Sequence, residues 1–177
     1  MYGAYETIEN RPGLRFERRL SHPIDVVWRA ITESDQLEHW FPSRVKLGEL
    51  RPGAEMTFTF EDMPLDAAPM TLTGRVTEFD PPRRFAFTWG DDHLRFELEP
   101  VAGSDQACLL RLTVLLDSRE KAARDGAGWH VCLDRLERRL DEAGGPAPGS
   151  GSDAEWRALY EEYQRRGAPA GAPIPGE

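Results

Sequence analysis

The feature that most constrains this chain is a long run of period-two segments between residues 43 and 116. In EMTFTFED, the apolar Met56, Phe58 and Phe60 alternate with polar residues, and the same alternation recurs in MTLTGRVTEFD, RFAFTWG, HLRFELEP and CLLRLTVLL. The turn-forming stretches DPPR, WGDDH and AGSDQ separate the later segments. One-sided alternation in successive strands with tight turns predicts an antiparallel meander that has one buried face and one solvated face.

A second pattern predicts the layer that covers the buried face of this sheet. The segment GWHVCLDRLERRLDEA carries apolar residues at intervals of three and four, which form one stripe along a helix. The stripe consists of Trp129, Cys132, Leu133, Leu136 and Leu140. Because a sheet with one apolar face must bury that face against another element, we expect this long helix to pack across the sheet.

Upstream of the meander, the sequence predicts one strand and two short helices. Residues 14–20, LRFERRL, alternate as in a strand, and SHPIDVVWRAIT continues with helical spacing and with Pro23 in the first turn. Thr32 and Asp35 resemble a capping box, which would start a second helix that ends at Pro42. The predicted fold class is therefore α+β, with a curved antiparallel sheet of six to seven strands wrapped around a long C-terminal helix and two short helices between the first two strands.

The rest of the chain divides into segments around a predicted domain at residues 14–143. Residues 1–13 are expected to be an N-terminal extension. Residues 144–152, which are rich in Gly, Pro and Ser, predict a flexible linker. Residues 153–166 predict an amphipathic helical tail, and residues 167–177 a disordered end.

The predicted tail helix has an aromatic stripe of its own. Trp156, Leu159, Tyr160 and Tyr163 are spaced i, i+3, i+4 and i+7. Because an isolated helix of this length is marginal in water, it should dock either on its own domain or on a partner. We favour docking on its own domain, near the mouth of a pocket.

Composition argues against several classes of function. The formal net charge is -9, and an acidic chain without a long basic block is a poor candidate for binding nucleic acid. We expect no membrane insertion, because no stretch approaches the roughly 18 apolar residues of a membrane span, and a cytoplasmic location, because the N-terminus lacks the pattern of a signal peptide. The two cysteines and four histidines have no metal-ligand spacing, so neither a metal nor a cofactor is expected.

The order of these elements resembles the helix-grip, START-like (SRPBCC) superfamily. Within it, the chain is most similar to domains related to activators of the heat-shock protein 90 ATPase. The resemblance is carried by HPIDVVWRAIT, LEHWFP, GRVTEFDPPRRFAFTW and GWHVCLDRLERRL, which lie within residues 14–141. It implies a cavity between the concave face of the sheet and the long helix, with the two short helices closing one end.

The residues expected to line that cavity come from the inward faces of the predicted elements. They are Trp28, Trp40, Phe41, Met56, Phe58, Phe60, Met70, Leu72, Phe87, Trp89, Phe96, Leu112, Trp129 and Leu133. Apolar pockets with few polar groups are typical of small-molecule sites, although the same side chains could simply fill the core. Gly126 and Gly128 either leave room on the long helix for a ligand or for the sheet, or belong to a loop that precedes the helix.

Three functions follow from this interpretation. The first is a non-enzymatic protein that binds a small apolar molecule such as a lipid, a polyketide or an aromatic metabolite. The second is a polyketide cyclase-like or hydrolase-like enzyme that uses His39 or His130 as a general acid or base. The third is an interaction protein whose partner is a chaperone. The sequence favours the first, because it has no nucleophile motif, and it does not define an oligomeric state.

Overall fold

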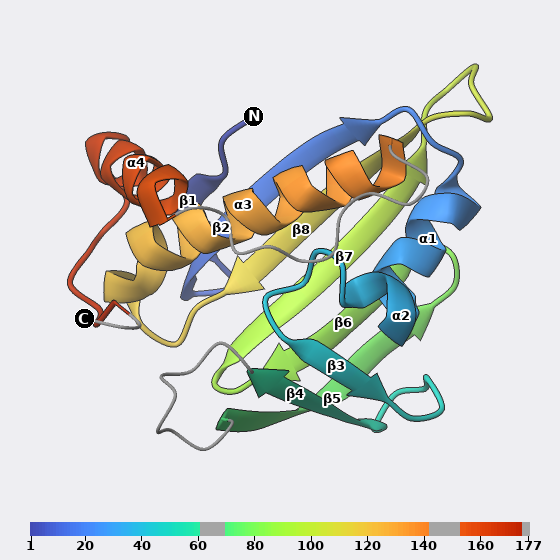
Figure 1. Ribbon diagram of the computed structural model, residues 1–177, viewed down its shortest axis with the longest axis horizontal. Coiled ribbons are helices and arrows are strands. Elements are labelled where there is room, and N and C mark those ends of the chain that lie inside the picture. The colour runs from blue at the N-terminus through green and yellow to red at the C-terminus, as the bar shows by residue number, and fades with distance from the viewer. Residues whose placement is uncertain (61–69, 142–152, 175–177) are drawn as a thin grey trace.

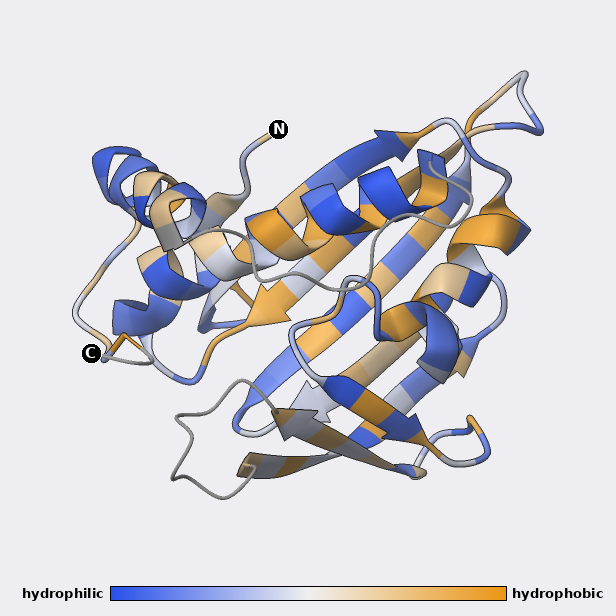
Figure 2. Cartoon of the chain, viewed as in Figure 1, coloured by the Kyte–Doolittle hydropathy of each residue, from blue (hydrophilic) through white to orange (hydrophobic). Residues whose placement is uncertain are grey.

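The period-two segments form the antiparallel sheet that the sequence predicts. In the computed structural model, which describes residues 1–60, 70–141 and 153–174, eight strands make one sheet in the order β1-β2-β8-β7-β6-β5-β4-β3 (Figure 1). The strands are β1 (Ala4–Ile8), β2 (Arg11–Leu20), β3 (Arg44–Leu47), β4 (Glu55–Phe60), β5 (Met70–Asp80), β6 (Arg84–Trp89), β7 (Asp92–Pro100) and β8 (Cys108–Leu115). Every neighbouring pair is antiparallel, and orange and blue segments alternate along the strands in Figure 2.

The helices follow the predicted order around this sheet. They are α1 (Ile24–Thr32), α2 (Ser34–Leu37), α3 (Ala122–Asp141) and α4 (Asp153–Arg165), and the 3-10 helix η1 (Arg119–Lys121) leads into α3. Figure 1 shows α3 lying across the sheet and α1 and α2 at one end of it. The α+β helix-grip fold is therefore confirmed, with one strand more than the six to seven expected. None of the helices in the described part of the chain combines the length and the apolarity that a membrane span requires.

The additional strand comes from the segment expected to be an N-terminal extension. Ala4–Ile8 form β1, which pairs with β2 through the register Ile8 to Arg11. The turn between the strands is tight because Glu9 and Asn10 have φ values of 52° and 62°. Asn tolerates this left-handed region better than most residues, and two such residues in succession are typical of a two-residue hairpin. The extension therefore folds back onto the sheet.

The predicted capping box at the second short helix is wrong. The Thr32 hydroxyl donates to the backbone oxygen of Trp28, 2.7 Å away, inside α1. Glu33 precedes α2, which is a single turn, and no side chain caps it. Backbone N–H groups of Trp40 and Phe41 then donate to the oxygen of Leu37, so these two residues lie in turns after the helix rather than within it.

The C-terminal helix and the described residues after it contact the rest of the domain. α4 packs against α3, so the tail docks on its own domain. Ala168 is buried, and the backbone oxygens of Pro169 and Pro173 accept hydrogen bonds from residues of α3. The described part of the predicted disordered end is thus held by α3. The predicted linker, residues 144–152, lies outside the described residues.

Candidate functional site

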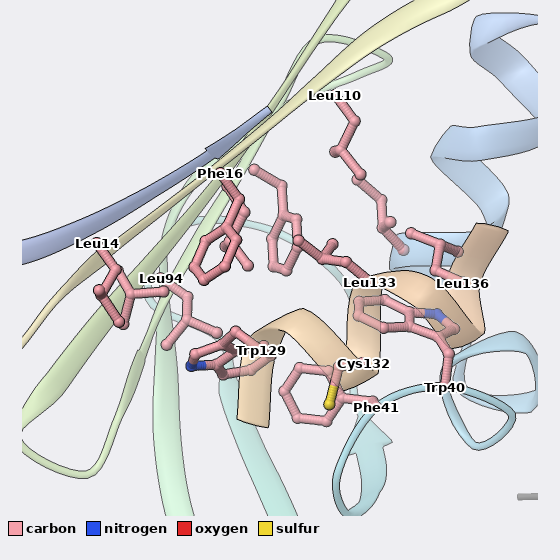
Figure 3. Close-up of a cluster of buried hydrophobic side chains, with 14 of the residues drawn as sticks. Leu14, Phe16, Trp40, Phe41, Leu94, Leu110, Trp129, Cys132, Leu133 and Leu136 are labelled. Atoms are coloured by element: carbon pink, nitrogen blue, oxygen red, sulfur yellow. The ribbon is translucent and has the colours of Figure 1, made fainter. Parts of the chain in front are cut away.

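An aromatic cluster lies between the concave face of the sheet and α3 (Figure 3). Phe41 lies at its centre, and its ring centroid is 5.5–6.2 Å from five other aromatic rings. These rings belong to Trp40, Phe58, Phe87, Trp89 and Trp129. Figure 3 shows Trp129, Phe41 and Trp40 gathered around α3, opposite side chains that rise from the sheet.

Local structure explains why these rings converge. Trp40 has no exposed surface, and its indole N–H donates to the backbone oxygen of Ala30, 2.8 Å away, which fixes the turn after α2 against α1. The chain then alternates between buried and exposed positions, so that Phe41 and Val45 point inward. Trp129 arrives from the opposite layer, on the stripe of α3 that faces the sheet.

Most of the predicted wall residues are buried in this core. The fully buried members of the predicted set are Trp40, Phe41, Met56, Phe58, Phe87, Phe96, Leu112, Trp129 and Leu133. Four others are only partly buried, namely Trp28, Phe60, Leu72 and Trp89. The aromatic side chains thus form a continuous packed interior, with a partly exposed margin on some sides.

Two predicted wall residues lie elsewhere. Met70 is 50% exposed, because it is the first residue of β5, and Val76 is the only residue of that strand that is fully buried. The expectation that Met70 lines the wall is therefore wrong. Trp28 packs against Phe79, with ring centroids 5.6 Å apart, and so belongs to the contact between α1 and β5.

The partly exposed margin near the cluster is aromatic. The rings of Phe60 and Trp89 stack with centroids 6.2 Å apart, and Trp89 also meets Trp129 edge-on at 5.2 Å. Both Phe60 and Trp89 are partly exposed. We call the partly exposed Phe60 and Trp89, together with the buried Trp129 that Trp89 contacts, the aromatic rim. The rim connects the surface to Phe41 in the interior, because Phe41 contacts both tryptophans.

Two buried polar atoms lie in this part of the molecule. Trp89 Nε1 and Ser43 Oγ have no hydrogen-bond partner among the described residues. Ser43 is 8% exposed and points inward between Phe41 and Val45, beside the end of β4 that carries Phe60. Sequence reasoning missed Ser43, although the alternation that continues from residue 41 to residue 47 could have placed it inside.

The two histidines proposed as acid or base candidates have different surroundings. His39 is partly exposed, and its buried Nδ1 has no partner within the described residues. His130 is 6% exposed, but it contacts α4 rather than the aromatic cluster, with Nδ1 3.1 Å from the Tyr163 hydroxyl. Burial lowers the pKa of His130 below its ordinary value. The structure therefore does not bring His130 to the edge of the cluster.

The two glycines lie inside α3, so the interpretation of them as a loop is wrong. The space they leave is used by α4. A Cβ atom on Gly126 would lie 3.0 Å from the Tyr163 ring, and one on Gly128 would lie 4.0 Å from Trp156 Nε1. Glycine at position 126 thus allows the tail helix to approach α3 closely.

Sequence analysis also missed a charged group at the start of α3. Lys121 forms ion pairs with Asp92, Asp117 and Asp125, and Asp92 is only 4% exposed. Burial raises the pKa of Asp92, whereas the hydrogen bond from Lys121 lowers the pKa of Asp117. The positive charge of Lys121 compensates the negative charges of these carboxylates. Among the residues described, no cluster of side chains could hold a metal ion. We interpret this group as an anchor between β7 and the N-terminus of α3.

Comparisons with known proteins agree with this architecture. A conserved protein of unknown function from Enterococcus faecalis is 22% identical, with a TM-score of 0.70 over 93% of this chain and 89% of its own. CalU16 from Micromonospora echinospora is 25% identical, with a TM-score of 0.68 over 93% and 90% of the two chains. A protein from Bordetella parapertussis is 26% identical, with a TM-score of 0.67 over 93% and 90%. No curated protein matches the chain.

The family model described as Activator of Hsp90 ATPase homolog 1-like protein matches residues 21–141. This segment contains both short helices, strands β3 to β8 and all of α3, and it covers well over half of the chain. The chain therefore belongs to the family of activator of Hsp90 ATPase homolog 1-like proteins, within the START-like superfamily.

Proposed function

We propose that this protein binds a small, mainly aromatic molecule at the aromatic rim. The observation that carries this proposal is that the stacked pair of Phe60 and Trp89 is partly exposed while it remains continuous with the buried cluster around Phe41. An aromatic ligand that stacks on this pair would extend the cluster by one ring. Offset-stacked and edge-on aromatic pairs are favourable beyond the area that they bury.

The unpartnered polar atoms suggest what else the ligand carries. An indole N–H is only a donor, so Trp89 Nε1 needs an acceptor, whereas the Ser43 hydroxyl can donate or accept. A hydroxyl or carbonyl oxygen on the aromatic ligand would supply the acceptor that Trp89 lacks. Leaving a buried donor unsatisfied costs about 1–3 kcal/mol, which is the gain available to a ligand that supplies the acceptor.

Binding is favoured over catalysis because the better-buried histidine belongs to a different part of the molecule. His130 contacts Tyr163 and Tyr2, on the side of α3 that faces α4. General acid–base chemistry on a ligand at the rim would require an ionisable group within hydrogen-bond distance of that ligand. The three side chains of the rim, Phe60, Trp89 and Trp129, are aromatic and do not supply such an ionisable group.

The indole N–H signals of the tryptophans offer a direct test. We expect 1-naphthol, added to isotope-labelled protein, to shift the indole N–H signal of Trp89 while the signals of Trp28 and Trp156 stay in place. Trp89→Phe assigns the signal, keeps an aromatic ring at the rim and removes the N–H donor. Loss of one hydrogen bond of about 1 kcal/mol should weaken the affinity for 1-naphthol roughly fivefold.

A matched control uses the same substitution at a tryptophan outside the rim. Trp28→Phe should bind 1-naphthol as the wild-type protein does, because Trp28 packs on Phe79 instead. 1-Methylnaphthalene, which lacks the oxygen, should bind wild-type protein and Trp89→Phe equally. A Trp89 signal that does not respond to either compound, or a uniform response of all the indoles, contradicts the proposal.

A further inference from the structure

Both ends of the chain meet against α3, at Tyr163 of α4. Tyr163 of α4 is 1% exposed, and its hydroxyl oxygen lies 2.8 Å from the backbone nitrogen of Gly3 and 3.1 Å from His130 Nδ1. Tyr2 packs edge-on against the His130 ring at 4.9 Å and the Tyr163 ring at 5.8 Å. Figure 1 shows α4 beside α3 and close to the N-terminus. Tyr163 thus joins three segments at one buried point.

Residues that follow α4 complete the N-terminus of α3. The first N–H groups of a helix have no acceptor within the helix itself. The N–H of Ala123 donates to the oxygen of Pro169, 2.9 Å away, and the guanidinium of Arg124 donates to the oxygen of Pro173 at the same distance. The C-terminal segment therefore caps the first turn of α3 from outside.

The first half of α3 depends on such support more than most helices do. It contains Gly126 and Gly128, and among the ordinary residues glycine is the weakest helix former. Trp129 follows immediately and contacts Phe41 and Trp89 of the aromatic cluster. The contacts with the two ends of the chain therefore hold the part of α3 that carries Trp129 of the aromatic rim.

The hydrogen bonds around Tyr163 suit a neutral imidazole. The Tyr163 oxygen accepts from the Gly3 N–H, and its own proton then needs an acceptor, which His130 Nδ1 provides when it carries no proton. Burial raises the pKa of Tyr163 to about 12, so the hydroxyl keeps its proton at neutral pH. A proton on Nδ1 would remove this acceptor from a buried hydroxyl.

Charged groups surround His130 on several sides. Asp134 lies 3.4 Å from Nε2 and favours the protonated ring, as does Glu155 of α4. Burial is the largest opposing factor, and the positive charges of Arg18 and of the amino terminus add to it, so that the pKa of His130 lies below its ordinary value. Asp134 is also shared, because it forms an ion pair with Arg18.

We propose that the two ends of the chain form a pH-responsive clamp on α3, which holds while His130 is neutral and loosens when the imidazole takes up a proton. Because burial in the docked state lowers the pKa of His130 below its ordinary value of 6.5, the docked state is fully favoured above that value. Its stability then falls as the pH drops below that value, since the undocked state binds the proton more tightly. Loosening would free α4, the N-terminal residues and the first turns of α3 together.

Amide hydrogen exchange across a pH series tests the clamp in the full-length protein. We expect the protection factors of amides in α4 and in residues 122–129 to fall by about tenfold between about pH 7.5 and pH 5. Amides of β8 should keep their protection and serve as the internal reference. His130→Asn should abolish the response, because the Asn oxygen can accept from the Tyr163 hydroxyl but takes up no proton.

Two further variants separate the clamp from general acid sensitivity. Burial also lowers the pKa of His93, whose Nε2 lies 2.8 Å from the Thr77 hydroxyl on the sheet, so His93→Asn should retain the wild-type response of α4. Tyr163→Phe should lower the protection of α4 already at about pH 7.5 and reduce its dependence on pH. Protection of α4 that does not change with pH in the wild-type protein, or an equal loss in His130→Asn, overturns the proposal.

Discussion

At the residue scale, Trp40 links the fold to the candidate site. It has no exposed surface, its N–H binds the oxygen of Ala30, and its ring meets Phe41 and Phe96. Trp40→Ala should therefore lower the free energy of unfolding by about 3–5 kcal/mol, measured by urea denaturation. Trp28→Ala is the control, because Trp28 is only partly buried and should cost clearly less. Equal losses at the two positions would contradict the assignment of Trp40 to the core.

The glycines of α3 give a second prediction. The same substitution, glycine to alanine, should change the free energy of unfolding in opposite directions at the two positions. Gly128→Ala should raise the free energy of unfolding by roughly 0.5–1 kcal/mol, since alanine favours the helix and the nearest atom, of Trp156, is 4.0 Å away. Gly126→Ala should lower it, because its Cβ would press on a Tyr163 ring that hydrogen bonds hold in place. Stabilisation by both substitutions would show that the ring yields easily. Urea denaturation of the two variants in parallel makes the comparison.

At the element scale, regular periodicity predicted the helices and strands reliably. Contacts between segments that are distant in the sequence could not be predicted from it. The stripe from Trp129 to Leu140 predicted α3, and alternation predicted the central strands, because these patterns report directly which face is buried. β1 escaped prediction because its pairing depends on the Glu9–Asn10 turn and on β2, not on a pattern of its own. The role of Gly126 could not be predicted, because Tyr163 lies far away in the sequence.

The same turn makes the hairpin of β1 and β2 testable. Asn10 has a φ of 62°, which costs a β-branched residue roughly 1–2 kcal/mol. Asn10→Val should therefore lower the free energy of unfolding by about that amount and increase amide exchange in β1. Asn10→Gly should be close to neutral, because glycine adopts this conformation without strain. If valine and glycine behave alike, the hairpin contributes little to stability.

At the scale of the whole molecule, the family-matched segment is completed by both ends of the chain. Residues 21–141 match the family, while β1, β2 and α4 lie outside that segment. Tyr163 and Ala168 are buried against the domain, and the oxygen of Pro169 caps α3.

Removal of residues 145–177 should thus expose apolar surface on α3 and leave an N–H of its first turn without that partner. At roughly 2–4 °C per kcal/mol for a chain of this size, a loss of about 3 kcal/mol would lower Tm by roughly 6–12 °C. Calorimetry of the truncated and full-length proteins at about pH 7.5 measures the difference, and an unchanged Tm would mean that α4 rests on α3 without stabilising it.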